Sequence, residues 1–216
     1  MDAQTFWNVI GHYNQDTVII QIILLVLIAF AIILERTSIN ISLVKIVLGI
    51  ANLFIGVVFF GIYGTEPIQK FFALPLYIIC GTLFLYEAWR NKTDRLNKFH
   101  FFQIILLVLY VLYPLISYIF GNRFPQMVTH IMPCPIVSLS IVVYASYSRK
   151  NRLLLLLLTI WGLTGIKSVV FSAYEDIILF ICGIYGIYLF VKEINCKKAE
   201  GTGSTSNHVG RQKENV

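Results

Sequence analysis

Seven long apolar stretches, separated by short polar segments, run through almost the whole chain. Most are about 18 to 22 residues long, and at about 1.5 Å per residue a helix of that length crosses a hydrocarbon core about 30 Å thick. They cover Thr17–Leu34, Ser42–Tyr63, Phe71–Trp89, Phe101–Phe120, Cys134–Ser148, Leu153–Phe171 and Ile177–Ile194. Polar and apolar residues do not alternate with a period of two, which disfavours a β-barrel. The pattern predicts an all-α, polytopic transmembrane helical bundle of seven spans, because helices satisfy their own backbone hydrogen bonds in lipid.

The fifth stretch is the least regular of the seven. It is short for a span, and Pro133 and Pro135 lie at its start. An alternative start near Val128 would lengthen it, so both its first residue and whether it fully crosses the membrane stay open.

Composition supports a membrane protein and argues against nucleic-acid binding. Hydrophobic residues make up 57% of the chain and charged residues only 13%, whereas soluble domains carry about 25% charged residues. The net charge is +6, but the Lys and Arg residues lie between the apolar stretches, where they act as topology signals. The predicted partner is therefore the lipid bilayer, with no nucleic acid. The oligomeric state and the identity of any small-molecule ligand stay open.

The basic residues are distributed unevenly between the two sides of the predicted bundle. One side carries 14 of them, the other carries only Lys70 and Arg123, and Lys167 lies inside the sixth stretch. Because basic residues are enriched in cytoplasmic segments, this distribution predicts an N-terminus outside and a C-terminus in the cytoplasm. An even number of spans would break the alternation, so span count and orientation support each other.

The first 16 residues are expected to form a short segment at the outer surface. Phe6, Trp7, Ile10 and Tyr13 recur at helical spacing, which suits an amphipathic helix in the membrane interface with Trp7 and Tyr13 at the headgroups. The segment contains Asp2 and no basic residue, which argues against a cleaved signal peptide.

The remaining residues divide into two parts. Residues 17–194 form the predicted seven-span membrane domain. Residues 195–216 contain mostly Gly, Ser, Thr, Asn and charged residues, and we expect them to form a disordered cytoplasmic tail.

With this orientation, the polar residues near the span ends gather mainly on the outer side. The candidates for a ligand-binding site are His12, Asn14, Gln15, His130, Cys134, Lys167, Tyr174, Glu175 and Asp176. Nitrogen, sulfur and carboxylate groups of this kind suit a transition metal, while the ammonium group of Lys167 suits an anionic group of a substrate. The sequence therefore predicts an outer-face pocket for a small molecule or a metal ion.

The same residues also have purely structural explanations. Asp16 can cap the first span, and Ser172 and Glu175 have the spacing of a capping box at the start of the seventh. Lys167 can extend to the membrane surface or pair with Glu175 or Asp176. No two candidate metal ligands have a recognised i, i+4 spacing, so a site and simple helix capping both remain open.

No catalytic residue and no cofactor is predicted. The sequence has no nucleotide-binding signature, Gly-x-Ser-x-Gly elbow or His-Glu-x-x-His motif. Lys167 is expected to be the only ionisable residue well inside a span, since Lys45 lies close enough to a span end to reach the surface. A deep carboxylate proton relay is therefore disfavoured.

Two apolar tripeptides match each other, Ile79-Cys80-Gly81 in the third stretch and Ile181-Cys182-Gly183 in the seventh. Seven spans arranged as three, one linker and three would form parallel repeats, as in some small-solute carriers. Chance is the favoured explanation for so short a match.

Three short motifs lie on the predicted outer side: Tyr13-Asn14-Gln15, Pro133-Cys134-Pro135 and Tyr174-Glu175-Asp176. Together they resemble a family of small bacterial multi-pass membrane proteins of unknown function, over Trp7 to about Ile194. The resemblance implies a location in the bacterial cytoplasmic (inner) membrane and supplies no activity. In that family threonines follow Pro-Cys-Pro, whereas Ile136 and Val137 follow here, so no hydroxyl role is carried over.

These observations favour a small-solute carrier or an exofacial ligand-binding protein over an enzyme. Two alternatives stay open. One is a membrane enzyme or metal protein with an exofacial site. The other is a structural or partner-binding membrane subunit in which the outer polar residues only cap helices.

Overall fold

The structure, a computed structural model, describes residues 3–37, 42–91, 94–171 and 173–210, and the regular elements in this part of the chain are all helical. The all-α prediction is therefore confirmed. The α-helices are α1 (Ala3–Thr37), α2 (Leu43–Phe54), α3 (Leu74–Arg90), α4 (Phe101–Ile119), α5 (Pro133–Tyr144), α6 (Arg152–Leu163) and α7 (Ile177–Gly210). Shorter stretches form the π-helices η1 (Ile55–Tyr63) and η2 (Gln69–Ala73) and the 3₁₀-helices η3 (Thr164–Phe171) and η4 (Tyr174–Asp176).

Five helical segments are long and apolar enough to cross a membrane: Ala3–Thr37, Leu43–Tyr63, Gln69–Arg90, Phe101–Ile119 and Tyr174–Asn195. On α1, for example, Ile19, Ile23, Val26 and Phe30 are all exposed, and lipid accommodates such a face better than water does. Each of the seven predicted spans coincides with a helix. However, α5 and α6 have only 12 residues each, so five spans are supported by length.

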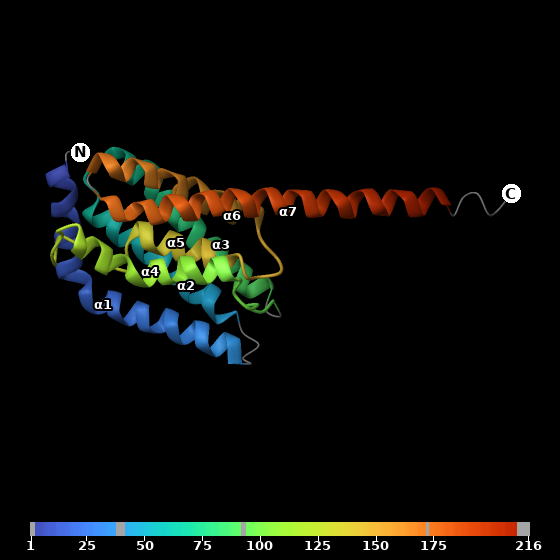
Figure 1. Cartoon of the computed structure of the whole chain (residues 1–216), viewed down its shortest axis with the longest axis horizontal. Coiled ribbons are helices and arrows are strands. Elements are labelled where there is room, and N and C mark those ends of the chain that lie inside the picture. Colours follow the sequence, from blue (N-terminus) through green and yellow to red (C-terminus); the bar gives the residue numbers. More distant parts are fainter. Residues whose placement is uncertain (1–2, 38–41, 92–93, 172, 211–216) are drawn as a thin grey trace.

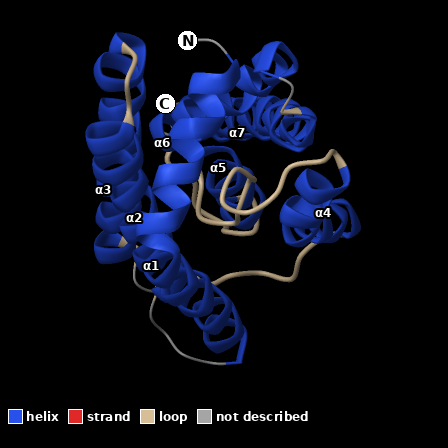
Figure 2. Ribbon diagram, turned by 90° about the vertical axis from the view of Figure 1, so that its left-hand side faces the viewer, coloured by secondary structure: helices blue, strands red, loops and turns tan. Residues whose placement is uncertain are grey.

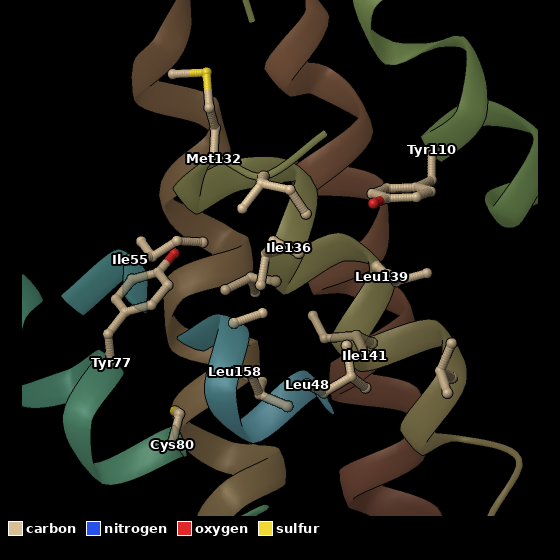
Figure 3. Close-up of a cluster of buried hydrophobic side chains, with 14 of the residues drawn as sticks. Leu48, Ile55, Tyr77, Cys80, Tyr110, Met132, Ile136, Leu139, Ile141 and Leu158 are labelled. Atoms are coloured by element: carbon tan, nitrogen blue, oxygen red, sulfur yellow. The ribbon is translucent and has the colours of Figure 1, made fainter. Parts of the chain in front are cut away.

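The short helix α5 lies in the middle of the bundle. All of its residues except Cys134 are buried, and Figure 2 shows the other helices arranged around it. Its side chains Ile136 and Ile141 lie near residues of α2, α3 and α6, whereas Leu139 points to the side of Tyr110 on α4 (Figure 3). A helix that is apolar on all sides suits such a position, and proline is tolerated in its first turn because no intrahelical N–H bond is lost there.

The most extensive helix–helix contacts are α6–α7 and α2–α3. Glycines lie where the backbones of each pair touch. A Cβ added to Gly183 would lie 2.6 Å from the carbonyl carbon of Gly162, and one added to Gly81 would lie 2.9 Å from the carbonyl oxygen of Gly49. In both matching tripeptides the cysteine is buried and the glycine contacts the preceding helix of its hairpin, so the two tripeptides occupy equivalent packing positions.

The bundle has two ends of different character. The motif end comprises the first turns of α1, the four irregular helices η1 to η4 and the α4–α5 loop (residues 120–132). The basic end comprises the last turn of α1, residues 94–100 before α4 and the loop of residues 145–151. In Figure 1 the motif end is on the left, where the first turns of α1 lie across the bundle before the helix turns along it.

Two terminal segments differ in detail from the expectation. Residues 3–16 are the first part of the continuous helix α1, and Tyr13 is fully buried, so its side chain contacts other parts of the protein and not lipid headgroups. At the other end, α7 continues to Gly210 and projects beyond the bundle (Figure 1). The boundary at residue 195 and the disordered tail stay predictions.

A buried charged cluster closes the basic end. Lys45 is 0% exposed. Its Nζ donates a hydrogen bond to Asp94 Oδ2 (3.2 Å), lies 3.8 Å from Glu87 Oε2 and stands 4.1 Å from the ring centroid of Tyr147. The Tyr147 hydroxyl donates in turn to Oε1 of the buried Glu35 (2.7 Å). The expectation that Lys45 extends to the membrane surface is therefore wrong, because its neutralising carboxylates lie inside the protein.

Candidate ligand-binding pocket at the motif end

A pocket of about 390 Å³ lies at the motif end, a volume within the range of small-molecule sites. Its walls come from the first turns of α1, the connection between α2 and α3, the start of α5 and the connection between α6 and α7. Most of the lining is apolar, and its aromatic members are Phe6, Phe59, Phe60, Phe72 and Trp161. Both glycine-packed hairpins therefore contribute their connections to one cavity.

All four irregular helices line this pocket. η1 contributes Phe59 and Phe60, η2 contributes Phe72, η3 contributes Lys167, and η4 contributes Asp176. π-Helical turns are rare in proteins, but those that occur are often found at functional sites. A stretch of 3₁₀-helix that continues an α-helix often marks a hinge. The backbone is therefore least regular where the cavity lies.

Gly165 explains how η3 comes close enough to the start of α7 to shape one wall. A Cβ at this position would lie 2.7 Å from the backbone nitrogen of Phe180 and 2.8 Å from the carbonyl oxygen of Asp176. Both are backbone atoms that cannot move aside easily, so only glycine permits the contact.

Asp176 supplies the buried carboxyl group of the pocket, whose lining also includes the half-buried Glu66. Its side chain is buried, and Oδ1 accepts a hydrogen bond from the Tyr113 hydroxyl (2.8 Å), while the Cys134 thiol is a second partner. Both partners are neutral, and within the described ranges Asp176 forms no ion pair. Burial without a cation is costly for a carboxylate, so a hydrogen-bond donor or cation on a ligand would bind favourably here.

Trp161 supplies a second polar group. Its indole Nε1 is buried and has no acceptor among the residues that the structure describes. Phe60 and Tyr77 pack edge-on against the indole, with ring centroids 5.4 and 5.1 Å away, and hold it in place. An unsatisfied buried donor costs about 1–3 kcal/mol, so a ligand acceptor would be stabilised at this point.

Lys167 lies at the rim of the pocket together with the exposed Ile68 and Phe72. The described side chains give it no ion pair with Glu175 or Asp176, so the predicted pairing is not observed. Its exposed position leaves the ammonium group accessible to a molecule entering the pocket.

Glu175 contacts a different part of the motif end from its neighbour Asp176. Its Oε1 accepts hydrogen bonds from Ser117 Oγ (2.7 Å) and Asn122 Nδ2 (3.4 Å), and the side chain does not line the pocket. The proposed capping-box partner Ser172 lies outside the described residues. Two adjacent carboxyls thus have separate surroundings, one facing the cavity and one holding the end of α4.

The first sequence motif anchors the α4–α5 loop. Asn14 Nδ2 donates to the carbonyl oxygens of Pro125 and Met127 (both 2.8 Å), and the Tyr13 hydroxyl donates to the carbonyl oxygen of Ile131 (2.6 Å). Asn14 is fully buried and lies outside the pocket lining. Its position indicates a structural role rather than contact with a ligand.

His130 also lies outside the pocket. Its Nε2 is 3.1 Å from the carbonyl oxygen of Val111, and its ring packs against Tyr110. Burial lowers the pKa of the imidazole, although the hydrogen bond to Val111 opposes this effect. A ring that carries a proton on Nε2 donates a hydrogen bond in this contact.

The other predicted site residues are dispersed. His12 and Gln15 are exposed on α1, and the exposed Tyr174 packs its ring against Phe120. In the part of the chain that the structure describes, no three His, Cys, Asp or Glu side chains are placed to hold a metal ion. Of the nine predicted residues, the pocket brings together Cys134, Lys167 and Asp176. Asp16, expected to cap the first span, instead lies within α1 and accepts a hydrogen bond from Tyr63.

Sequence reasoning missed the aromatic walls, because Phe59, Phe60 and Trp161 lie within apolar stretches and look like core or lipid-facing residues. The available signal was glycine near the outer ends of two spans, at Gly61 and Gly165. Such glycines weaken a regular helix, and here they lie in the irregular stretches that form the pocket.

Comparison with known proteins gives one match. A family model described as "Family of unknown function (DUF6064)" matches residues 3–200, which include the whole pocket. No curated protein and no solved structure matches the chain.

Proposed function

The chain belongs to this family of unknown function (DUF6064), whose description names no activity, and we propose that it is a multi-pass membrane protein that binds a small molecule in the motif-end pocket. One observation carries the proposal. Four irregular helical stretches converge on an apolar cavity that is lined by Asp176, which has a buried carboxyl group, and by Trp161, whose buried indole N–H has no acceptor among the described residues.

The lining defines the chemistry of the ligand. Five aromatic side chains favour a largely apolar body, since burial of apolar surface supplies most of the binding energy in such sites. The head group should accept a hydrogen bond from Trp161 and donate one to Asp176. Lys167 at the rim would accommodate a negative group that remains outside.

We further propose seven spans, with the N-terminus and the pocket outside and the C-terminus inside the bacterial cytoplasmic membrane. The support is the uneven distribution of basic residues and the five segments long enough to cross a membrane. Within this topology α5 and α6 are the two short spans, and their neighbours shield α5 from lipid.

Cysteine labelling tests the orientation. Gln15 and Lys98 are both exposed and lie at opposite ends of the bundle, so Q15C and K98C form a matched pair. An impermeant maleimide should label Q15C in intact cells and K98C only after lysis. Labelling of K98C from outside would overturn the proposed orientation.

A small-solute carrier is a second candidate. The observation that favours it is the pair of glycine-packed hairpins whose irregular connections meet at the pocket, because carriers often place discontinuous helices at the interface of two similar units. Uptake or efflux by proteoliposomes would distinguish transport from binding alone.

Ligand retention tests the binding function. Native mass spectrometry of the protein purified in a mild detergent should reveal a bound small molecule in the wild-type chain. D176N should lose it, whereas E175Q, which changes the neighbouring buried carboxyl outside the pocket, should retain it. If D176N and E175Q behave alike, or if no small molecule stabilises the wild type against heat, the motif end is structural and the alternative of a membrane subunit is favoured.

A further inference from the structure

A second, larger groove lies at the basic end, between the start of α4, the α5–α6 loop and α7. Its volume is about 1300 Å³. The rings of Phe102 on α4 and Tyr185 on α7 meet across it, with centroids 5.2 Å apart. Otherwise α4 packs mainly against α5 and much less against α7, and this loose contact leaves the groove open.

One face of α7 forms the long wall of the groove. Its members recur at helical spacing: Ile181, Ile184, Tyr185, Tyr188, Leu189 and Lys192. From the first to the last of these the helix rises about 17 Å, close to half the thickness of a hydrocarbon core of about 30 Å. Ile184 is 51% exposed and Tyr188 is 59% exposed, so the apolar stripe is open to its surroundings.

The groove becomes basic at the end nearest the 145–151 loop. Arg149, Lys150 and Lys192 line it there, against a single acidic lining residue, Glu193. Lys150 is fixed by a hydrogen bond from its Nζ to the carbonyl oxygen of Tyr147 (2.6 Å). The side chains of Arg149 and Lys192 are exposed and form no ion pair with any residue that the structure describes.

We propose that this groove binds one anionic phospholipid, with its phosphate at Arg149 and Lys192 and an acyl chain along the Ile181–Tyr188 face of α7. The proposal depends on the chain lying in a membrane and is independent of the ligand pocket at the motif end. Basic pockets between transmembrane helices on the cytoplasmic side suit anionic headgroups, and tyrosine suits the boundary between headgroup and acyl region.

The two parts of the groove select a lipid over other anions. A soluble phosphate would engage only the basic residues and would leave the apolar stripe of α7 uncovered. A zwitterionic headgroup would bring a cation towards Arg149 and Lys192, which repel it. An anionic lipid alone matches the apolar wall and the basic end together.

Lipid titration of the delipidated full-length protein, followed by native mass spectrometry, tests the proposal. Phosphatidylglycerol should bind about tenfold more tightly than phosphatidylcholine with the same acyl chains, since both basic residues favour the anionic headgroup. R149Q/K192Q should abolish this preference. R36Q/K98Q is the matched control, because it removes the same charge from the basic end outside the groove lining, and it should preserve the preference.

Three further arms separate the groove from other occupants. Y188S should weaken the binding of both lipids to the same extent, because it removes apolar surface from the groove. An excess of sn-glycerol 3-phosphate should not displace phosphatidylglycerol. If R149Q/K192Q does not fold, the single exposed change K192Q should still reduce the preference. The proposal would be overturned if the wild type bound the two lipids equally, or if R149Q/K192Q or K192Q kept the full preference. It would also be overturned if glycerol phosphate displaced the lipid, or if the wild type formed a dimer that Y188S dissociates, since a second copy of the chain would then cover the groove.

Discussion

The two ends of the bundle bury carboxyl groups in opposite ways. At the basic end, Glu87 and Asp94 surround the buried ammonium group of Lys45. At the motif end, Asp176 and Glu175 are buried as deeply, but the partners found for them in the described chain are hydroxyl, thiol and amide groups.

This difference separates a closed structural cluster from a group that remains able to bind. A carboxylate paired with a buried cation is already neutralised, and breaking the pair exposes both charges to a low dielectric. A carboxyl held only by neutral donors, and bordered by a cavity, can still gain a partner. The basic end therefore stabilises the bundle, and the motif end is the better place for recognition.

The strongest test of the contrast is removal of the cation at the basic end. Lys45→Met leaves Glu87 and Asp94 buried without a counter-charge, and should lower the free energy of unfolding by about 3–5 kcal/mol. Thermal unfolding in detergent measures the change. Lys70→Met, an exposed lysine at the motif end, should have almost no effect, and equal effects for the two variants would contradict the proposed role of Lys45.

Loss of the loop anchor should be the next largest effect. Asn14→Ala leaves the carbonyl oxygens of Pro125 and Met127 without their donor, and should cost about 3 kcal/mol. Gln15→Ala changes the exposed neighbour and should stay within about 0.5 kcal/mol. Proteolysis of residues 120–132 should become faster only in Asn14→Ala; unchanged proteolysis would show that the loop is held by other contacts.

Neutralising the pocket carboxyl should affect stability less. Asp176→Asn keeps an oxygen that accepts the hydrogen bond from Tyr113, and it removes a buried carboxyl group that has no cation beside it. The free energy of unfolding should therefore change by about 1 kcal/mol or less. Asp94→Asn removes a charge that faces Lys45 and should cost clearly more. If thermal denaturation ranks these two asparagine variants in the opposite order, the contrast between the ends fails.

The smallest effect should be a pH dependence from His130. Because burial lowers its pKa in the folded protein, the unfolded chain takes up the proton first as the pH falls. The contribution of His130 to the free energy of unfolding is therefore greatest above the pKa of the unfolded chain, about 6.5, and declines as the pH drops below that value. Unfolding temperatures between pH 7.5 and 5.5 should show this decline, and His130→Phe should reduce it; an equal decline in His130→Phe would contradict the role of His130.

The sequence predicted where the seven α-helices lie, because long apolar runs are a strong local signal. It did not predict that Lys45 is buried, since its partners Glu87 and Asp94 lie far along the chain and only tertiary packing brings them together. For the pocket, Asp176, Cys134 and Lys167 were identified by their polarity. Trp161 was not, because an aromatic residue in an apolar span carries no sign of an unsatisfied N–H group.

The position of α5 has a consequence for biogenesis. This helix is the fifth of the seven α-helices along the chain, yet nearly all of its residues are buried, and α6 and α7 are among the helices that enclose it. When α5 emerges from the ribosome, α6 and α7 have not yet been synthesised, so the helices that bury α5 are incomplete. Assembly can be completed only after α7 has been inserted, and a chain truncated before α7 should be a substrate for membrane quality control.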